Sequence, residues 1–243
     1  MAAAASDTLR VTVLRGAGAK DHFDHFEVPR AANQTVLDVV TWIQQHLDPT
    51  LAYRFACRVG MCGSCAMTVN GSPRWTCRTH VSGVARNGRL EVGPLRNFPI
   101  VRDLVVDMNP MFDRWTAAQA RHHPGGTRDA PVAEISPQTP QRIAADAAIE
   151  CINCGVCHAA CDTVAGNADY LGPAPLQRAW TVLNDCKDTG RDAVLAAVSG
   201  HGGCHNCHSM GSCATHCPVG LRPMDAIAGL KRETVRAALG KGR

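Results

Sequence analysis

The chain has 243 residues, of which 45% are hydrophobic and 19% are charged, and its formal net charge is +4. This length and composition are typical of a globular protein with one large domain or two ordinary ones, and they exclude a disordered chain. The basic residues form no dense stripe, so we expect no nucleic-acid partner. No apolar run approaches the roughly 20 residues that cross a bilayer, so attachment to a membrane would need another subunit.

The chain contains 13 cysteines, most of them in tight clusters. Disulfide frameworks belong to small secreted domains, whereas the start of this sequence, MAAAASDTLRVTV, lacks the basic and long apolar regions of a secretory signal. We therefore expect a cytosolic chain whose clustered thiols bind metal.

The first elements in chain order are two strands and a helix. Residues 8–14 and 22–28 alternate between apolar and polar side chains, which predicts two neighbouring antiparallel strands. Thr35 is suited to cap a helix whose apolar residues recur at helical spacing and which ends before Pro49.

Three short strands follow this helix. Strands are predicted at 66–69 and 89–92, and the pair Asn70-Gly71 indicates a hairpin whose second strand runs to Cys77. Two strands, a helix and short strands around one cysteine loop are typical of a β-grasp ferredoxin, which we place at residues 1–105.

Four cysteines of this half stand in the frame C-x4-C-x2-C…C, which is the plant-type spacing for a [2Fe–2S] cluster. They are Cys57, Cys62, Cys65 and Cys77. Gly60 and Gly63 would let the backbone approach the cluster and direct amide N–H groups at its sulfurs. A structural zinc site is the alternative, but zinc ligands come in closer pairs or as mixtures of Cys and His.

The segment after the sheet is expected to be helical beyond Pro99. Residues 116–139 are rich in Pro, Gly and polar residues without an apolar period, so we expect a connecting segment. His122 and His123 lie in it, and we interpret them as solvated loop histidines without a role.

The second half predicts helices. Thr139-Pro140 would cap and begin one that leads to Cys151, and Pro175 would begin another. Further helices are expected at 191–198 and 222–239, the last with an apolar face. The fold class is therefore α+β: the β-grasp domain is followed by a mostly helical domain at residues 106–243.

Two cysteine runs of this helical half match the bacterial ferredoxin pattern, in which three cysteines bind one cluster and the fourth crosses to a second cluster. The crossing predicts a [4Fe–4S] cluster held by Cys151, Cys154, Cys157 and Cys217. It leaves three thiolates for the other cluster, namely Cys161, Cys207 and Cys213. Met210 stands where a fourth would be, and because a thioether is a poor ligand beside a thiolate, we predict a [3Fe–4S] cluster there.

Two cysteines remain outside this assignment. Cys204 lies three residues before Cys207 and is a rival ligand by spacing alone. We interpret it, and Cys186 near a helix end, as non-ligating thiols that pack as small hydrophobic residues.

The motifs together resemble the iron–sulfur subunit of succinate dehydrogenases and fumarate reductases. The resemblance rests on FACRVGMCGSCAMTVNG at 55–71, FPIVRDLVVDM at 98–108, ECINCGVCHAAC at 150–161 and CHSMGSCATHCPVGL at 207–221. It implies a subunit of a succinate:quinone oxidoreductase that relays single electrons between the FAD of a flavoprotein subunit and quinone through the three clusters. It also implies that this chain performs electron transfer and no dicarboxylate chemistry.

The same resemblance implies a peripheral position on the cytoplasmic face of the membrane, held by an anchor subunit. His208 matches a position near the quinone, where it would contact quinone or donate to a cluster sulfur or a carbonyl. Many relatives have proline after the cysteine that matches Cys161, with a ubiquinone-contacting tryptophan beyond it, whereas this chain has Asp162. It is therefore more similar to the branch with a cytochrome b anchor that carries heme b, often with menaquinone.

Two other functions fit part of the pattern. One is a soluble electron-transfer subunit for a different flavoprotein, or for a thiol-dependent fumarate reductase, without quinone. The other is an interaction protein stabilised by zinc, which metal and acid-labile sulfide analysis would separate from the cluster proteins.

Overall fold

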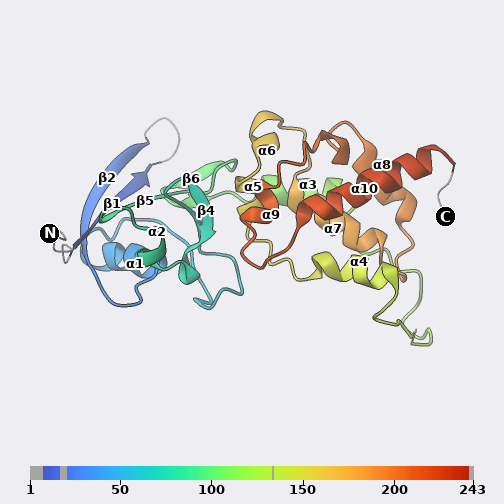
Figure 1. Ribbon diagram of the computed structural model, residues 1–243, viewed down its shortest axis with the longest axis horizontal. Helices are drawn as coiled ribbons and strands as arrows, with labels where there is room; N and C mark the ends of the chain where they lie inside the picture. The colour runs from blue at the N-terminus through green and yellow to red at the C-terminus, as the bar shows by residue number, and fades with distance from the viewer. Residues whose placement is uncertain (1–7, 17–20, 133, 241–243) are drawn as a thin grey trace. The chain divides into compact units, whose positions relative to one another are not determined.

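The computed structural model describes residues 8–16, 21–132 and 134–240 (Figure 1). The chain divides into two compact units. The first unit comprises Met1–Met108 with Ile152–Ala159, and the second comprises Asn109–Cys151 with Ala160–Arg243. Residues 152–159, which the sequence analysis placed with the helical domain, thus pack in the first unit. Among the described residues, no helix is long and apolar enough to span a membrane.

The first unit is built on a five-stranded mixed sheet with the order β2-β1-β5-β3-β4. β1 pairs antiparallel with β2 and parallel with β5, while β3 pairs antiparallel with both β4 and β5. The predicted strands are confirmed, except that β4 ends at Trp75 and Cys77 lies in the short helix that follows. Their bounds are β1 Thr8–Arg15, β2 His22–Pro29, β3 Ala66–Val69, β4 Ser72–Trp75 and β5 Arg89–Gly93.

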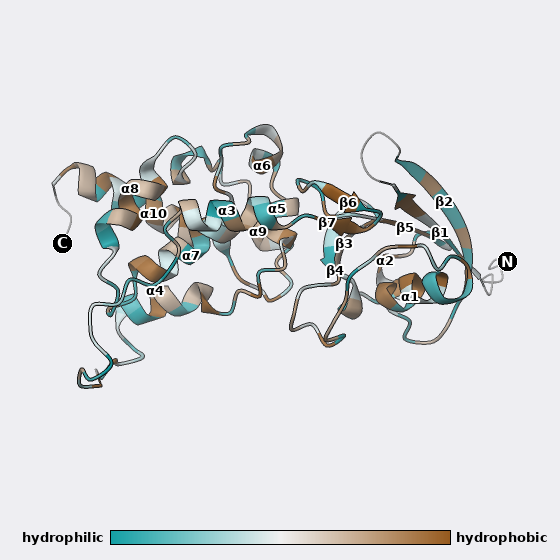
Figure 2. Cartoon of the chain, turned by 180° about the vertical axis from the view of Figure 1, so that it is seen from behind, coloured by the Kyte–Doolittle hydropathy of each residue, from teal (hydrophilic) through white to brown (hydrophobic). Residues whose placement is uncertain are grey.

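Helix α1 (Val36–His46) supplies the other half of this unit's core. Thr35 caps it as predicted, because its side chain accepts from the Asp38 N–H while the Asp38 carboxylate accepts from the Thr35 N–H. The buried residues of α1 and the inner strands form one apolar cluster, and Figure 2 shows the hydrophobic colouring of these strands against the largely hydrophilic edge strand β2. Burial of this apolar cluster fixes the orientation of α1 and the sheet, which lie on either side of the cysteine loop in the chain.

The hairpin between β3 and β4 has the predicted turn. Asn70 and Gly71 both have positive φ, at 47° and 78°, as a type I′ turn requires. The Asn70 side chain also accepts from the Glu91 N–H and donates to the Val84 carbonyl, so it ties the hairpin to β5. Beyond β4 the chain forms the short helices η2 (Thr76–Arg78) and α2 (Val81–Val84).

The predicted helix after Pro99 is wrong. A two-stranded hairpin of β6 (Ile100–Arg102) and β7 (Val105–Val106) occupies that segment, and α3 begins only at Asn109 and ends at Ala117. The hairpin turns at Asp103, which is 3% exposed and accepts from the N–H groups of Gly16 and Ala52. Arg15 Nε lies 3.1 Å from the same carboxylate. These contacts from distant parts of the chain hold the hairpin, and local sequence does not encode them.

The second unit is helical, as predicted. Its longer helices are α3 (Asn109–Ala117), α4 (Pro140–Ile149), α7 (Pro173–Leu183), α8 (Arg191–Ser199) and α10 (Pro223–Ala238). The short α6 (Asp162–Gly166), η3 (Cys204–Asn206) and α9 (Ser212–Thr215) lie between them in the chain. Thr139 caps α4 as expected. α7 begins at Pro173 rather than at Pro175, since Gly172 with φ 89° ends the preceding extended stretch and Pro173 occupies the first helical position.

Helices α7 and α10 pack closely in this unit. A Cβ atom added to Gly229 would lie 2.5 Å from the Trp180 ring, so the glycine allows the two helices to approach. Both helices contribute to one apolar cluster that also contains Cys204 and has Cys161 and Cys207 packed against it. The core of the unit therefore lies directly beside two of the predicted ligands.

Most described residues of the connecting segment are exposed, as the sequence suggested, but one of its histidines is partly buried. Within the described residues 118–132 and 134–139 there is no helix or strand, as expected. However, His122 Nδ1 lies 3.0 Å and His123 Nδ1 3.5 Å from the Asp188 carboxylate, which is 2% exposed. The His123 and Gly190 N–H groups also donate to Asp188. The interpretation of His123 as a solvated loop residue is therefore wrong, because its side chain is 21% exposed and a buried carboxylate anchors it, whereas His122 is 44% exposed beside the same carboxylate.

Candidate functional site

The first thiol constellation lies in the loop of residues 55–65, which we call the cluster loop, and in η2. Its amides point at cysteine sulfurs. The N–H groups of Val59, Met61 and Cys62 lie 3.5, 3.3 and 3.3 Å from Cys57 Sγ. The Cys57 N–H lies 3.5 Å from Cys62 Sγ, and the Cys77 N–H lies 3.5 Å from Cys65 Sγ. Donors directed at sulfur stabilise thiolates, so this loop fits an iron–sulfur cluster.

Left-handed backbone conformations allow the loop to curl in this way. Gly60 and Gly63 have φ of 76° and 71°. A Cβ atom at Gly60 would lie 3.0 Å from the Arg78 side chain, and one at Gly63 would lie 2.5 Å from Cys154 Cβ, which belongs to the same unit. Both glycines are therefore required by conformation and by space, as the sequence analysis expected.

The four thiols of this site differ in electrostatic environment. Hydrogen bonds from the Cys57 N–H and from Ser64 lower the pKa of Cys62 to about 6. Burial raises the pKa of Cys77 to about 11, with a further contribution from Cys65 and an opposing one from the Gly60 N–H. The site thus offers one thiolate near neutral pH and one thiol that a bound metal would deprotonate.

The surface of the cluster loop is apolar. Phe55, Val59 and Met61 are 41%, 59% and 69% exposed. The Arg58 guanidinium lies 5.4 Å from the centroid of the Phe55 ring and 2.9 Å from the Asp38 carboxylate. Apolar side chains grouped around a candidate redox site are typical of a surface that another protein covers.

The second constellation lies entirely in the second unit. Cys161 precedes α6, Cys207 follows η3 and Cys213 lies in α9. The three cysteines line one cavity, which we call the three-thiol cavity, together with Tyr170 and Met210. Burial raises the pKa of Cys213 to about 11, and the nearby Cys161 and Cys207 raise it further. The structure therefore brings together the three residues that the sequence analysis assigned to a [3Fe–4S] cluster.

Met210 marks the open side of this cavity. Its side chain is 67% exposed although it lines the cavity. His208 is also exposed and lines the same cavity. The position that would carry a fourth thiolate thus faces outward and holds a weak, uncharged sulfur donor.

The environment of Cys207 includes groups that sequence reasoning missed. The Ser209 N–H lies 3.4 Å from Cys207 Sγ, and Lys231 Nζ donates to the Cys207 carbonyl at 2.6 Å. Tyr170 is 1% exposed and lines the same cavity; burial first, and then the neighbouring cysteines, raise the pKa of its hydroxyl. No local motif distinguishes Tyr170 or Lys231, so only the fold reveals them.

The four cysteines of the predicted [4Fe–4S] set divide between the two compact units. Cys154 and Cys157 lie in the first unit, where α5 (Val156–Ala159) also belongs, and Cys151 and Cys217 lie in the second unit. Gly155 has φ 75°, and a Cβ atom there would lie 2.9 Å from the Met108 side chain. This loop therefore shares the glycine-dependent packing of the cluster loop, while its ligand set stays a prediction from the sequence frame.

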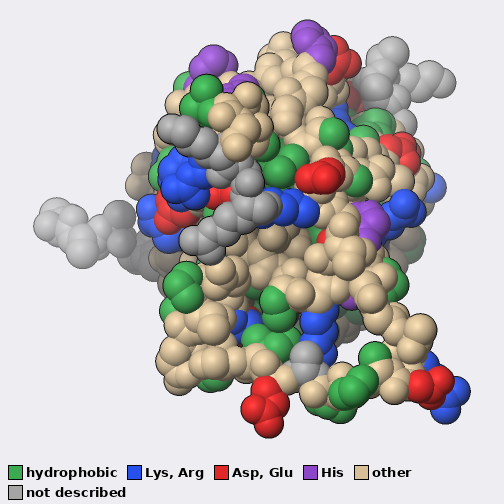
Figure 3. Space-filling view, turned by 90° about the vertical axis from the view of Figure 1, so that its right-hand side faces the viewer, with side chains coloured by type: hydrophobic (Ala, Val, Ile, Leu, Met, Phe, Trp, Pro, Cys, Tyr) green, Lys and Arg blue, Asp and Glu red, His purple; other side chains and the backbone are tan. Residues whose placement is uncertain are grey.

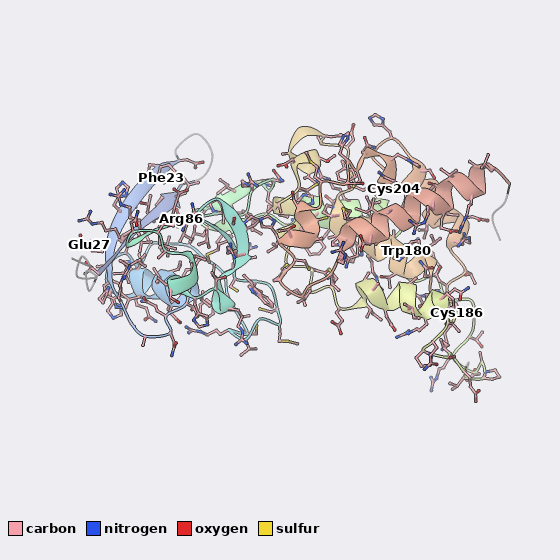
Figure 4. The ribbon with its side chains drawn as sticks, viewed as in Figure 1. Phe23, Glu27, Arg86, Trp180, Cys186 and Cys204 are labelled. Carbon is pink, nitrogen blue, oxygen red and sulfur yellow. The ribbon has the colours of Figure 1, made fainter. Side chains whose placement is uncertain are left out.

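The remaining two cysteines lie in different surroundings (Figure 4). Cys204 is fully buried in the apolar cluster of the second unit, and burial raises the pKa of its thiol. Cys186 is exposed in the loop after α7, so the expectation that it packs is wrong. Within the described ranges, no group of three or more His, Cys, Asp or Glu side chains is arranged around a single metal ion.

Comparison with known proteins decides the family. Residues 8–113 match the model of a 2Fe-2S iron-sulfur cluster binding domain, and residues 150–222 match that of a 4Fe-4S dicluster domain. The fumarate reductase iron-sulfur subunit of Mycobacterium tuberculosis is 37% identical over 226 residues, which cover 90% of this chain and 88% of the relative. The mitochondrial succinate dehydrogenase [ubiquinone] iron-sulfur subunit of Dictyostelium discoideum is 31% identical over 245 residues, which cover 90% and 85%. The chain belongs to the family of succinate dehydrogenase and fumarate reductase iron–sulfur subunits.

A solved structure agrees with this membership. A chain of the Mycobacterium smegmatis Sdh1 complex in the apo form superposes on this chain with a TM-score of 0.84 and 25% sequence identity. The match covers 96% of this chain and 97% of that one. The predicted family and the α+β fold class are thereby confirmed, and the two matching models confirm the 2Fe-2S and 4Fe-4S kinds of cluster. The iron–sulfur subunit is an electron-transfer component of an oxidoreductase complex.

Proposed function

We propose that the iron–sulfur subunit connects the FAD of a flavoprotein subunit with quinone at a membrane anchor, in a complex that interconverts succinate and fumarate. The observation that carries this proposal is the contrast between two sites: an amide-lined loop with four thiols and a cavity with three thiols and an exposed methionine. Bound iron–sulfur clusters supply one-electron chemistry, while flavin and quinone exchange two electrons. Two relatives carry fumarate reductase and succinate dehydrogenase names.

The ligand assignment follows the sequence frame. We assign Cys57, Cys62, Cys65 and Cys77 to [2Fe–2S], Cys151, Cys154, Cys157 and Cys217 to [4Fe–4S], and Cys161, Cys207 and Cys213 to [3Fe–4S]. The amides directed at Cys57 and Cys62 support the first set, and the shared cavity supports the third. The residues of the chain thus stabilise thiolate charge and exclude water from the buried sulfurs.

The cluster loop is suited to meet the flavoprotein subunit. Exposed Phe55, Val59 and Met61 provide the apolar centre of an interface, and Arg58 and Asp38 provide a polar rim. Burial of these side chains by a partner would bring its cofactor close to the loop sulfurs. No residue of this chain needs to contact the dicarboxylate.

The three-thiol cavity is suited to the quinone end. Met210 and His208 are exposed beside its thiols, and the name of the Dictyostelium relative includes ubiquinone. We propose a cytochrome b type anchor with heme b on the cytoplasmic face of the membrane. At that interface, His208 would hydrogen-bond or protonate quinone.

Electron paramagnetic resonance of the purified complex tests the ligand sets. We expect a [3Fe–4S] signal in the oxidised state and a [2Fe–2S] signal after reduction, together with a flavoprotein and an anchor subunit among the co-purifying chains. Two [4Fe–4S] clusters without a [3Fe–4S] signal would refute the role of Met210. Zinc without acid-labile sulfide would refute the cluster assignment as a whole.

A further inference from the structure

The second unit contains another cavity, which we call the helical cavity and which shares no lining residue with the three-thiol cavity. Its volume is about 480 Å³, within the range of roughly 300 to 1,000 Å³ that small-molecule sites occupy. Its walls come from α4, α7, α10 and the start of α8, and α7 packs against both α4 and α10 (Figure 1). Among the described residues that line it, none is a cysteine, so the proposed clusters leave it unused.

One side of the helical cavity is apolar. Trp180 and Leu183 line it from one face of α7, and Ala144 lines it from α4. The Trp180 ring packs on the α10 backbone, because a Cβ atom at Gly229 would lie 2.5 Å from the ring, and Trp180 lies beside α10 in Figure 4. The Trp180 side chain is only half-buried. The small side chain of Ala144 therefore leaves part of an aromatic surface open to a ligand.

Charged groups form the other side of the cavity. Arg191 Nη2 lies 2.6 Å and Arg236 Nη1 lies 2.7 Å from the Glu233 carboxylate, so each carboxylate oxygen has one arginine. Burial alone would raise the pKa of Glu233, but the hydrogen bonds from Arg191 and Arg236 lower it, so the carboxylate is charged at neutral pH. Two guanidinium groups and one carboxylate leave one excess positive charge in the lining.

The combination of these two sides selects the chemistry of a ligand. The contacts with Glu233 use one nitrogen of each arginine, whereas a guanidinium has five N–H donors. Donors of this geometry match the two oxygens of a carboxylate. The first turn of α4 also lines the cavity, and the partial positive charge of a helix N-terminus acts in the same direction. The aromatic wall favours a flat apolar body.

We propose that the helical cavity binds a small carboxylate with a flat apolar body. The carboxylate accepts from Arg236 and Arg191, and the body lies against Trp180 and Leu183. This inference goes beyond the proposed function, because it takes no cysteine as a ligand and moves no electron through the cavity. An occupant joins α4 to α7 and α10, so it stabilises the folded second unit.

The test uses cinnamate, a flat aromatic carboxylate, and cinnamamide, which has nearly the same shape without the charge. Isothermal titration calorimetry of the complete purified complex measures the affinity of each. We expect saturable binding of cinnamate to the iron–sulfur subunit. Cinnamamide should bind about tenfold more weakly, because it loses the charge-assisted hydrogen bonds.

Arg236→Gln tests the charged side of the cavity. Arg236 is 62% exposed, so its replacement should leave the fold intact while weakening cinnamate binding about tenfold. The affinity for cinnamamide should change little. Arg232→Gln is the matched control, because it removes the same charge from an exposed position on α10 that does not line the cavity. Cinnamate should bind to it as to wild type.

Ala144→Leu tests the space itself. The larger side chain fills part of the cavity and keeps both arginines, so the affinities for cinnamate and cinnamamide should both fall. Ala147→Leu is the control on the same helix, because Ala147 is exposed and does not line the cavity. This variant should bind both compounds as wild type does.

Each result bears on the proposal. Equal affinities for cinnamate and cinnamamide would overturn the carboxylate class, and so would wild-type binding of cinnamate by Arg236→Gln. Absence of binding to the wild-type complex, or unchanged binding to Ala144→Leu, would overturn the site itself. The cluster signals of all four variants should equal those of wild type, so a failure of the proposed cluster assignments would be seen separately.

Discussion

The cluster loop of the first unit and the three-thiol cavity of the second unit present their sulfurs in different ways. In the cluster loop, backbone amides supply the donors, and glycines with positive φ aim them. Around the cavity, short helices deliver the cysteines, and side chains of neighbouring elements complete the surroundings: Tyr170 lines the cavity and Lys231 donates to the Cys207 carbonyl. Substitutions should therefore act through backbone geometry at the first site and through side-chain chemistry at the second.

The largest effect is expected from Met210→Cys. A fourth thiolate at this position completes the ferredoxin frame, so the cluster should convert from [3Fe–4S] to [4Fe–4S], with a lower potential and slower quinone reduction. The measurement is the [3Fe–4S] signal of the oxidised complex, which should disappear. Met210→Leu is the matched control and should keep the signal; spectra identical to wild type in Met210→Cys would contradict the frame.

Gly63→Ala should show how strictly the first site depends on its backbone. The added Cβ atom would lie 2.5 Å from Cys154 Cβ at a φ of 71°, so we expect a loss of about 3 kcal/mol or more in the free energy of unfolding and a weakened [2Fe–2S] signal. Chemical unfolding and cluster spectroscopy measure the two effects.

Gly71→Ala separates the strain of a positive φ from the steric contact with Cys154. Gly71 has a similar φ of 78°, but nothing lies within 4 Å of its added Cβ atom. This variant should lose only about 1 kcal/mol, the usual cost of a left-handed conformation. Equal losses in the two alanine variants would show that the contact with Cys154 is unimportant.

Asp103→Asn tests the buried ion pair that holds the β6–β7 hairpin. Removing the charge leaves Arg15, whose side chain is 8% exposed, without one of its carboxylate partners, and we expect a loss of about 3 kcal/mol. Unfolding of the sheet, followed by circular dichroism, measures it. Asp113→Asn, at an exposed position in α3, should change stability little.

The stabilisation that Asp103 provides depends on pH, and its direction follows from the pKa of the carboxyl group. Burial alone would raise the pKa of Asp103, but the Gly16 and Ala52 N–H groups and Arg15 together lower it below 3.8. A lowered pKa in the folded state means that the stabilisation is complete above pH 3.8 and is lost as the pH falls through the folded value. The stability difference between wild type and Asp103→Asn should therefore narrow below pH 3.8.

A small effect is also expected from Asp188→Asn in the second unit. The carboxylate holds His122 and His123, so its loss should release the connecting segment at a cost of about 1 kcal/mol. Limited proteolysis should cut residues 120–132 faster than in wild type. Asp185→Asn, whose carboxylate is 42% exposed and 4.0 Å from His122, is the control, and equal cleavage of both variants would argue against the Asp188 contacts.

Local patterns predicted the elements that local chemistry determines. Alternation predicted β1 and β2, the Thr35 cap predicted α1, and Asn70-Gly71 predicted the hairpin, because each depends on residues close in the chain. The prediction after Pro99 failed because contacts between Asp103 and distant Gly16 and Ala52 determine that hairpin.

The candidate sites divide in the same way. Cysteine spacing was enough to group Cys161, Cys207 and Cys213, since ligand frames are written directly into the sequence. The place of Tyr170 in the cavity and the anchoring of His123 by Asp188 could not be predicted, because both depend on segments far apart in the chain. On the face in Figure 3, charged side chains of both signs are interspersed with hydrophobic ones. This mixed surface gives no sign of the buried contacts beneath it.

The contact between Gly63 and Cys154 has a consequence for the spacing of the proposed clusters. Both residues belong to the first unit, as do Cys157 and the four cysteines around the cluster loop. Two ligands of the proposed [4Fe–4S] cluster therefore belong to the unit that holds the four cysteines of the proposed [2Fe–2S] cluster. Under the proposed ligand sets, this packing inside one folded unit would hold Cys154 close to the cluster loop, and the missing Cβ atom of Gly63 would keep that distance short.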